Sequence, residues 1–416
     1  MGWMSWERFR CGVRHSEAET AAISADLYLN QADKLVKHGL VELGYARVHV
    51  DDCWQASERD GAGHLQANAT RFPEGIAGLA AKLGEKGVGL GLYTDEGTAT
   101  CGGYPGSKGT EALDAQTMAA WNVSYLKVDG CENDASDYAR GYAAFGEALS
   151  SEGLVFSCSW PAYLGDDEAA KPYEAMVAAG CSLWRNWKDI QCSWDSLIEV
   201  VNHFGDYSKV LSAAAPPGVY NDPDMLLVGN PCVTLGEARL QMAVWSILGA
   251  PLVRRVGLRG RPQGVPTDRP LPVPHGCFGV SQIMGNDLTN ISQEALDILR
   301  NEEVIAVNQA IAVKGWRESP RGASEVWVRE LGDGGDLAVA LLYKGNKGDD
   351  PTLAGFSLSQ IGWKHGTTAK VRDLFARRDM GVIETNFVAE VPPHDCRLFR
   401  LSKAAPAAAS RKLLLR

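Results

Sequence analysis

Short apolar runs alternate with amphipathic segments along the first three quarters of the chain. Several of the runs, such as VGLGLY from Val88, are continuously apolar, which is typical of strands buried on both faces of a parallel sheet. Segments 21–43 and 235–248 repeat apolar residues at steps of three and four, which predicts helices between the strands. The pattern predicts eight strands, at residues 2–6, 46–54, 88–97, 123–131, 154–160, 181–189, 219–226 and 283–288.

Eight alternating strand and helix units predict an α/β fold, the (β/α)8 TIM barrel, with an open α/β sheet as the alternative. After about residue 310 the pattern changes to short β-prone runs separated by Gly, Asp and Lys turns, which predicts an antiparallel β-sandwich. We therefore expect a barrel over 1–310, a C-terminal antiparallel β domain over 311–402 and a disordered tail over 403–416. The β-prone runs are 325–330, 337–343, 369–374, 382–389 and 397–401.

The composition is that of a globular protein, since 45% of the 416 residues are hydrophobic and 22% are charged. The net charge of −10 argues against a nucleic-acid partner, because phosphates are neutralised by Lys and Arg. No run of about 18 apolar residues is present, so we expect no membrane span. Twelve Trp residues are a high count, and stacking against sugar rings is one reason for such a count.

Carboxylates and tryptophans stand where the predicted strands end. In a barrel these ends and the loops after them build the active site. A single Asp there is usually a helix N-cap, but carboxylates at several strand ends, interleaved with Trp, indicate one shared site. The residues at these ends include Trp6, Asp51, Asp52, Trp54, Tyr93, Asp95, Glu96, Lys127, Asp129, Ser159, Trp160, Trp184, Arg185, Trp187, Asp189, Asp222, Asp224, Met225 and Asp287.

This set of residue types favours a carbohydrate substrate. Metal sites usually recruit His or follow fixed spacings of oxygen ligands, and His is nearly absent from the strand ends, so we expect no metal and no cofactor. No G-x-S-x-G motif supports a serine hydrolase. Carboxylates accept hydrogen bonds from sugar hydroxyls, and an aromatic face covers the apolar side of the ring.

Glycoside hydrolysis needs two carboxyl groups in different protonation states. Asp129 is the better candidate for the ionised nucleophile, because Lys127 lies two residues earlier on the same strand and points the same way. Asp189 follows the aromatic-rich segment WRNWKD, where burial would raise its pKa and suit it to act as the acid. The sequence leaves open that these roles are exchanged, or that Asp224 takes one of them.

Seven motifs occur in an order that closely resembles glycoside hydrolase family 27, the α-galactosidases and α-N-acetylgalactosaminidases. They are MGWMSWERFRC, HVDDCW, GLGLYTDEGTATCGGYPGS, YLKVDGC, FSCSWPAYL, LWRNWKDI and YNDPDMLLVGN, and the resemblance runs from Met1 to about Leu401 with one interruption. It implies a barrel with a C-terminal β domain, a retaining exo-glycosidase mechanism by double displacement, and a tendency to form homodimers. An inactive sugar-binding homologue is the alternative from another class.

By matching motif, the resemblance implies that Asp129 is the nucleophile and Asp189 the acid/base. It implies that Asp51 and Asp52 bind the 4- and 6-hydroxyls of the sugar. The same matching places further side chains around the sugar, namely Trp6, Tyr93, Lys127, Arg185, Asp224 and Met225.

The segment SWPAY distinguishes the two specificities. Animal α-galactosidases place Glu and Leu there, whereas α-N-acetylgalactosaminidases place Ser and Ala. This chain has Ser159 and Ala162, followed by Tyr163. Small side chains leave room for an acetamido group, so the motif favours α-N-acetylgalactosaminidase with residual α-galactosidase activity, since galactose is smaller.

Ten cysteines are present. The resemblance pairs Cys11 with Cys53, Cys101 with Cys131, and Cys158 with Cys181, and it offers no partner for Cys192, Cys232, Cys277 or Cys396. Six paired cysteines imply an oxidising compartment, and sequons occur at Asn68, Asn122 and Asn290. We therefore expect a lysosomal, vacuolar or secreted protein, with a leader peptide that this chain, starting at Met1, lacks.

The interval between the last two predicted strand starts is 64 residues, against 27–44 for the others. Removing residues 253–282 joins Leu252 to Ile283 and restores the family pattern APLIMGNDL. The segment is rich in Arg, Pro and Gly and has no periodicity. Its first codon, for Val, must begin with GT, and its last, for Gln, can be CAG, so we hypothesise an intron retained in frame. The alternative is a genuine lineage-specific loop.

Overall fold

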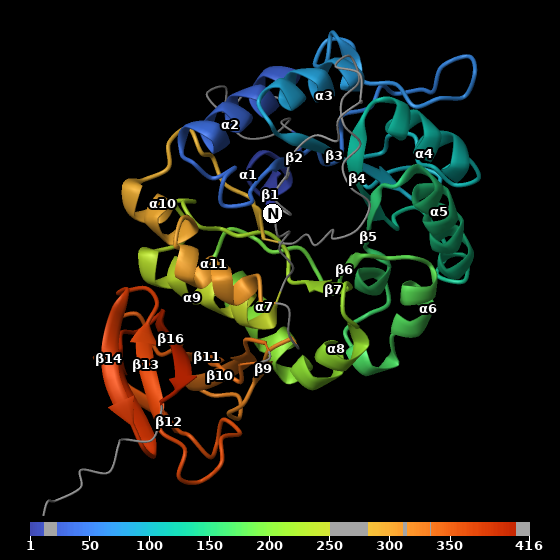
Figure 1. Cartoon of the computed structure of the whole chain (residues 1–416). Coiled ribbons are helices and arrows are strands. Elements are labelled where there is room, and N and C mark those ends of the chain that lie inside the picture. Colours follow the sequence, from blue (N-terminus) through green and yellow to red (C-terminus); the bar gives the residue numbers. More distant parts are fainter. Residues whose placement is uncertain (12–22, 250–281, 311–313, 333, 405–416) are drawn as a thin grey trace, which may run out of the picture.

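The computed structural model describes residues 1–11, 23–249, 282–310, 314–332 and 334–404. Its first part is a closed sheet of eight parallel strands surrounded by helices, seen in Figure 1 as a ring of coils around the strands. The strands are β1 Gly2–Met4, β2 Arg47–His49, β3 Gly89–Asp95, β4 Val123–Asp129, β5 Val155–Cys158, β6 Leu183–Arg185, β7 Tyr220–Asp222 and β8 Ile283–Met284.

The predicted barrel is confirmed, and the open sheet is excluded by the way the strands close. The sheet order runs from β7 through β1 to β8. Leu226, just after β7, pairs in parallel with Met284, and its N–H donates to the Ile283 carbonyl over 2.8 Å. Each predicted strand is present but shorter, because its last residues turn outward into the loops at the mouth of the barrel.

Helices cover the outside of the barrel because each presents an apolar face to the strands. α9 begins with a reciprocal capping box between Thr234 and Glu237 and ends at Gly249, whose φ of 66° suits the left-handed C-cap position. The helices are α1 Trp6–Phe9, α2 Ala25–Lys37, α3 Gly75–Glu85, α4 Glu111–Ala120, α5 Tyr138–Glu152, α6 Tyr173–Ala178, α7 Trp194–Asp206, α8 Ser208–Ala214, α9 Leu235–Leu248, α10 Gln293–Leu299 and α11 Glu302–Asn308. Two short 3₁₀ turns occupy Trp160–Tyr163 and Glu168–Ala170.

The second part is an antiparallel sandwich that packs beside α9 and α11 (Figure 1). Its larger sheet has the order β14-β13-β16-β11-β10-β9, and β12 pairs with β15 in a second sheet. Alternate residues of the two sheets form one apolar core, in which Phe356 and Phe387 face Phe399. The strands are β9 Trp316–Arg317, β10 Ser324–Glu330, β11 Leu337–Tyr343, β12 Thr352–Ser357, β13 Ala369–Asp373, β14 Arg378–Ile383, β15 Asn386–Val391 and β16 Asp395–Lys403.

Two details of the sandwich differ from the sequence pattern. The run expected at 382–389 is divided between β14 and β15, because the chain reverses at residues 384 and 385. β12 was not expected at all. It pairs with β15 in a two-stranded sheet, its apolar side chains are few, and its Leu353 is 73% exposed.

Arg329 of β10 joins the sandwich to the barrel. Its guanidinium is buried and donates to the carbonyls of Ser246, Val307, Asn308 and Ala310 over 2.8–3.1 Å. These carbonyls lie in or just after the last turns of α9 and α11, where helices leave acceptors without an internal partner. A positive charge there also matches the negative ends of the two helix dipoles.

The segment 253–282 lies outside the described residues except for Gln282, and the expected tail lies outside them from residue 405. Gln282 is buried, and its carbonyl accepts a hydrogen bond from the Gly2 N–H over 3.3 Å. Among the described residues, no helix is both long and apolar enough to cross a membrane.

Candidate active site

The strand ends open into a cavity of about 210 Å³ at the mouth of the barrel. Ten of the thirteen residues predicted for the site line it, namely Trp6, Asp51, Asp52, Tyr93, Asp129, Ser159, Ala162, Tyr163, Arg185 and Asp189. The other three, Lys127, Asp224 and Met225, line a smaller space that Arg185 shares with it. Residues that are more than 200 positions apart in the sequence thus meet at one place.

Lys127 lies beside the cavity and contacts two of the carboxylates that line it. Its ammonium group lies 2.9 Å from Asp51 Oδ2 and 3.7 Å from Asp129 Oδ2, and its side chain is buried. Lys127 and Asp129 are two residues apart on β4 and point to the same side, as the strand period requires. Burial raises the pKa of Asp51 to about 6, although the charge of Lys127 partly offsets this. The cation therefore favours the ionised form of Asp51 and lies within contact distance of Asp129.

In the part of the chain that the structure describes, backbone N–H groups, and not a positively charged side chain, orient the carboxylate of Asp52. Its two oxygens accept the backbone N–H groups of Cys53 over 2.6 Å and Gly102 over 2.7 Å. Burial raises its pKa above the usual range. The loop after β3 thus holds Asp52 in place, and the carboxyl group still borders the cavity.

Asp189 lies on the other side of the cavity, on the segment that follows β6. Trp6 Nε1 donates to its Oδ2 over 3.2 Å, and Arg185 donates to its Oδ1 over 3.1 Å. Burial favours the neutral carboxyl, but the positive charges of Arg185 and Lys127 outweigh that effect, and the pKa of Asp189 falls to about 2. The expectation that aromatic neighbours would raise this pKa is therefore wrong, because Arg185 at the end of β6 and Lys127 of β4 both lie near the group.

Asp224 and Met225 lie below the cavity, on the turn that follows β7. Asp224 has a φ of 74°, a left-handed conformation held by its N–H bond to Asp222 Oδ1 over 2.9 Å. Its carboxylate lies 3.1 Å from Arg185 and accepts the N–H of Ile190 over 2.9 Å. Arg185 is therefore shared by two carboxylates, and its Nε has no partner among the described residues.

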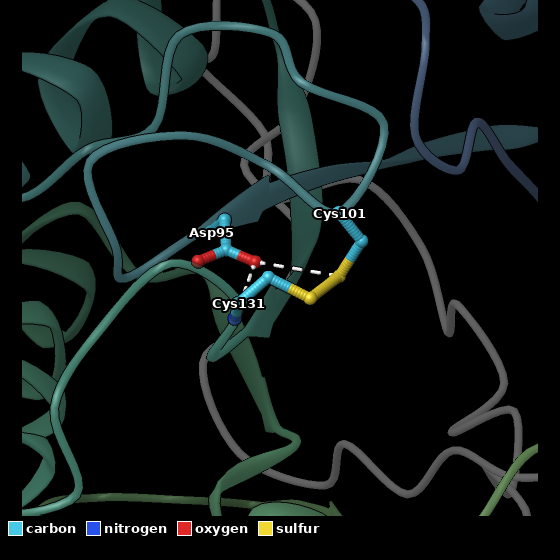
Figure 2. A group of neighbouring side chains, drawn as sticks. All are labelled: Asp95, Cys101 and Cys131. Atoms are coloured by element: carbon cyan, nitrogen blue, oxygen red, sulfur yellow. Dashed lines mark hydrogen bonds between the residues drawn. A yellow bond between two sulfur atoms is a disulfide. The ribbon is translucent and has the colours of Figure 1, made fainter.

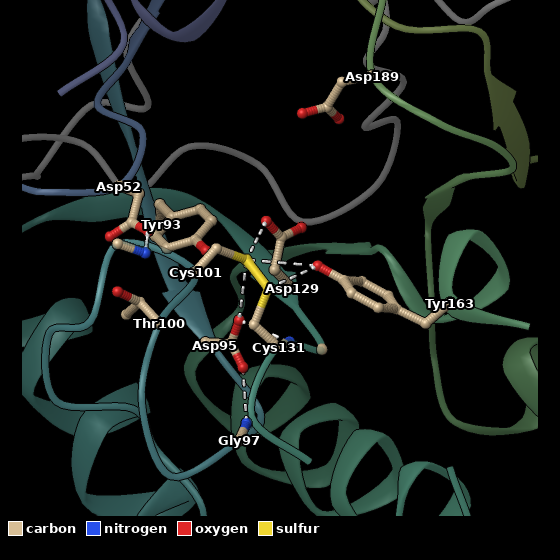
Figure 3. The surroundings of a disulfide bond; sticks show 12 residues. Asp52, Tyr93, Asp95, Gly97, Thr100, Cys101, Asp129, Cys131, Tyr163 and Asp189 are labelled. Carbon is tan, nitrogen blue, oxygen red and sulfur yellow. Dashed lines mark hydrogen bonds between the residues drawn. A yellow bond between two sulfur atoms is a disulfide. The ribbon is translucent and has the colours of Figure 1, made fainter. Parts of the chain in front are cut away.

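A disulfide between Cys101 and Cys131 forms part of the cavity wall, as Figure 3 shows. Cys101 Sγ lies 3.8 Å from Asp129 Oδ2, and Tyr163 OH lies 3.5 Å and 3.3 Å from the two sulfurs. Gly97 lets the two loops approach, because a side chain there would strike the Cys131 carbonyl. In Figure 3 the carboxyl groups of Asp129 and Asp189 turn toward the same space.

Asp95 lies directly behind this disulfide (Figure 2). Its carboxyl is buried and accepts the N–H groups of Gly97 and Cys131 over 2.7 and 3.0 Å. Burial and the charge of Asp129 raise its pKa to about 8, so that it carries a proton at neutral pH. The ligand-type atoms of Asp95, Cys101 and Cys131 lie within 4.8 Å of one another. Both sulfurs are bound to each other, so they do not offer the thiolates that a metal requires.

Ser159 and Ala162 come from the turn after β5. Ser159 is 2% exposed, and its hydroxyl has no hydrogen-bond partner among the described residues although it borders the cavity. Ala162 lies in the 3₁₀ turn three residues on, followed by Tyr163. The short side chains of Ser159 and Ala162 leave space for a ligand, and the unpartnered buried hydroxyl of Ser159 offers it a hydrogen-bonding group.

The tryptophans are mainly structural, which corrects the expectation that several lie at the rim. Trp3, Trp54 and Trp184 are fully buried, and their indole N–H groups donate to Asn286 O, Tyr93 O and Asn221 Oδ1. Of the tryptophans that the structure describes, only Trp6 and Trp187 line the cavity.

Cys101 and Lys188 also line the cavity and were not predicted to do so. The sequence held a signal for each of them. Cys101 is the expected disulfide partner of Cys131, which follows the proposed nucleophile by two residues, and Lys188 directly precedes Asp189.

Four disulfides are present among the described residues. Cys11–Cys53, Cys101–Cys131 and Cys158–Cys181 have Cα separations of 5.4, 5.3 and 5.8 Å. The fourth, Cys192–Cys232, has a Cα separation of 5.4 Å and corrects the view that these two cysteines lack partners. It joins the segments after the neighbouring strands β6 and β7, which lie 40 residues apart in the sequence at the two cysteines. Cys396 is free and buried, and Cys277 lies outside the described residues.

An α/β barrel whose mouth gathers two facing carboxylates, further oriented carboxylates and two indole rings is the site of a glycoside hydrolase. Comparison with known proteins agrees with this class. The family model described as alpha galactosidase A matches residues 1–263, and the one described as alpha galactosidase C-terminal beta sandwich domain matches residues 321–401. The chain belongs to glycoside hydrolase family 27.

Individual relatives carry two different activity names. An alpha-N-acetylgalactosaminidase from Gallus gallus is 36% identical over 429 residues, covering 100% of this chain and 98% of the relative. Alpha-galactosidase A from Homo sapiens is also 36% identical, over 348 residues that cover 83% of this chain and 73% of that protein. The crystal structure of alpha-galactosidase I from Mortierella vinacea has a TM-score of 0.79 at 26% identity, covering 97% of this chain and 98% of that one.

Proposed function

We propose that this protein is a retaining exo-glycosidase that removes terminal α-linked N-acetylgalactosamine, and more slowly galactose, from glycoconjugates. The observation that carries this specificity is the pairing of Ser159 with Ala162 in the cavity wall, where the Ser159 hydroxyl is buried and without a partner. An acetamido group at carbon 2 would fill the space and bond that hydroxyl. An α-galactosidase is the second candidate, because one relative of equal identity carries that name.

In the proposed first step, a carboxylate oxygen of Asp129 attacks the anomeric carbon while the bond to the leaving oxygen breaks. Asp189 gives its proton to that oxygen, so the leaving group departs as a neutral alcohol. In the second step, Asp189 takes a proton from water, whose oxygen attacks the same carbon and releases Asp129. Lys127 contacts Asp129, and Arg185 contacts Asp189 and favours its ionised form, which suits the second step, in which Asp189 accepts a proton.

The remaining side chains hold the sugar. Asp51 and Asp52 present oriented carboxylates that would accept from the 4- and 6-hydroxyls, and Lys127 supplies a donor beside Asp51. Trp6 and Tyr93 cover the ring from the wall of the cavity, and Tyr163 lies beside the disulfide. In this proposal, Arg185, Asp224 and Met225 close the cavity from below.

Hydrolysis of nitrophenyl α-N-acetylgalactosaminide and nitrophenyl α-galactoside tests the proposal. We expect kcat/KM to favour the first substrate and both activities to vanish in Asp129→Asn. Higher kcat/KM on the galactoside would favour the second candidate. Binding of either sugar without any turnover by the wild-type protein would support the inactive sugar-binding homologue instead.

We further propose that the enzyme works in an acidic, oxidising compartment, either a lysosome or vacuole or outside the cell. Four disulfides support the oxidising condition, and the low pKa of Asp189 supports the acidic one. A homodimer remains a prediction, for which sedimentation of the purified protein is the test.

The division at residue 310 and the intron hypothesis also remain proposals. Sequencing the transcript across Leu252 to Ile283 decides the second. A dominant messenger that contains the segment would contradict a retained intron and support a genuine loop.

A further inference from the structure

The segment that carries Asp189 is weakly held by packing. Ile190 is buried, but the next two residues, Gln191 and Cys192, are exposed. The Asp189 side chain itself is 45% exposed. A general acid must keep its carboxyl within hydrogen-bond reach of the leaving oxygen, so a mobile segment at this place would lower the rate of proton transfer.

The polar contacts that hold this segment come from several directions. Ile190 N–H donates to Asp224 Oδ2 over 2.9 Å, and Gln191 N–H donates to Ser196 Oγ over 2.8 Å. On the far side, Arg10 donates to Gln191 Oε1 over 2.9 Å. The first of these bonds is buried and the other two are exposed, and single hydrogen bonds of this kind contribute only about 1 kcal/mol each.

The covalent link is Cys192–Cys232, three residues after Asp189. Cys232 belongs to the segment between β7 and α9, which also supplies Asp224. The carboxylate that binds Ile190 and the sulfur that binds Cys192 thus come from the same segment. The chain is thus attached at Ile190 by a hydrogen bond and two residues later at Cys192 by a covalent bond. These two attachments leave the chain from Asp189 to Cys192 little freedom to move away from the cavity.

We propose that the Cys192–Cys232 disulfide is a positioning element for the general acid/base, holding the segment 189–192 so that Asp189 stays opposite Asp129. This inference rests on the proposed role of Asp189. It goes beyond that role, because the disulfide touches neither substrate nor the reacting atoms and acts only through the segment that it ties. Its loss should therefore impair the steps that need proton transfer and spare those that do not.

Leaving-group dependence tests the inference in the full-length enzyme. The variant C192S/C232S is compared with wild type on α-N-acetylgalactosaminides of 2,4-dinitrophenol, which needs no protonation, and of a simple alkyl alcohol, which does. We expect kcat/KM for the alkyl substrate to fall about 10- to 100-fold, with a change of less than about threefold for the dinitrophenyl substrate. Equal losses on both substrates, or no loss on either, would overturn the inference.

Two controls make the outcome specific. C158S/C181S removes a buried disulfide that does not border the acid segment, and it should leave the ratio of the two rates unchanged. D189A should show a larger change in the same ratio. If D189A shows no leaving-group dependence, the proposed acid/base role fails; if D189A shows it and C192S/C232S does not, only the positioning role fails.

Loss of folding does not obscure this test. The same folded molecules turn over both substrates, so the ratio of rates is independent of the folded fraction. If the double variant yields no folded enzyme, the single variant C192S, which also lacks the bond, is measured in the same way. Its kcat/KM against pH adds a second readout, because a displaced Asp189 would lose its contact with Arg185 and its profile would shift to higher pH.

Discussion

Arg185 donates to Asp189 Oδ1 over 3.1 Å and so stabilises the charged form of the proposed acid. With the pKa of Asp189 lowered to about 2, the protonated fraction at neutral pH is small and rises as the pH falls. We predict that kcat/KM for an alkyl glycoside rises about tenfold per pH unit as the pH is lowered from 7 to 5. A flat profile between pH 5 and 7 would contradict the prediction, and the dinitrophenyl substrate, which needs no acid, serves as the control.

Asp129→Asn should abolish turnover without abolishing sugar binding. The amide retains the size of the carboxyl but is not a nucleophile, so kcat should fall by about 10³-fold or more while the sugar contacts of Asp51 and Asp52 persist. Initial rates together with calorimetric binding of N-acetylgalactosamine check both halves. Substantial residual activity would reassign the nucleophile.

Ser159→Glu combined with Ala162→Leu should exchange the specificity. Larger side chains would fill the space beside carbon 2, so the ratio of kcat/KM for the N-acetylgalactosaminide to that for the galactoside should fall about 10- to 200-fold. Ser159→Ala keeps the space and removes only the hydroxyl, and it should change the ratio far less. An unchanged ratio in the double variant would show that the acetamido group lies elsewhere.

Asp95→Asn should change the pH dependence of stability. The pKa of Asp95 is about 8 in the folded state and about 3.9 when unfolded, so the folded state binds the proton more tightly. The contribution of protonated Asp95 to stability is complete below about pH 4 and is lost as the pH rises toward 8. The variant does not titrate there, so the stability of wild type relative to the variant should fall across this window.

Urea denaturation of both proteins at pH 4.5, 6 and 8 measures that difference, whose slope should be on the order of 1 kcal/mol per pH unit. The NH2 group of the amide in Asp95→Asn would face one of the two backbone N–H groups that donate to Asp95, and two donors repel each other. This lowers the stability of the variant by an amount that does not depend on pH. A constant difference at all three values would mean that Asp95 is ionised in the folded protein.

Arg329→Met should destabilise the whole chain. Met fills most of the volume but leaves four buried carbonyls at the ends of α9 and α11 without their donor, at a cost of about 2–5 kcal/mol. Arg329→Lys keeps the positive charge but has fewer N–H donors than the planar guanidinium, so its stability should lie between that of Arg329→Met and that of wild type. Thermal unfolding measures both, and a Met variant as stable as wild type would show that water replaces the guanidinium.

The sequence by itself determined the barrel, the sandwich and the residues of the cavity. Short continuous apolar runs and helical apolar repeats are local signals, and barrel active sites are built at the strand ends. Asp129 beside Lys127 is such a local relationship, because two residues on one strand share a face. The other predicted site residues came from the seven motifs, because each motif is a continuous stretch of sequence that can be matched to the family by itself.

Only the tertiary structure decided what depends on charges and bonds between distant segments. Burial alone would raise the pKa of Asp189, as its aromatic neighbours in the sequence predict, but Arg185, four residues before it at the end of β6, and Lys127 of β4 lower it to about 2. The contribution of Lys127 follows only from the folded barrel. Cys192 meets Cys232, and Trp3, Trp54 and Trp184 serve the core rather than the rim, for the same reason. The folded barrel places side by side groups that are far apart in the sequence. Electrostatic interactions and disulfides depend on distance in space, so the sequence pattern does not reveal them.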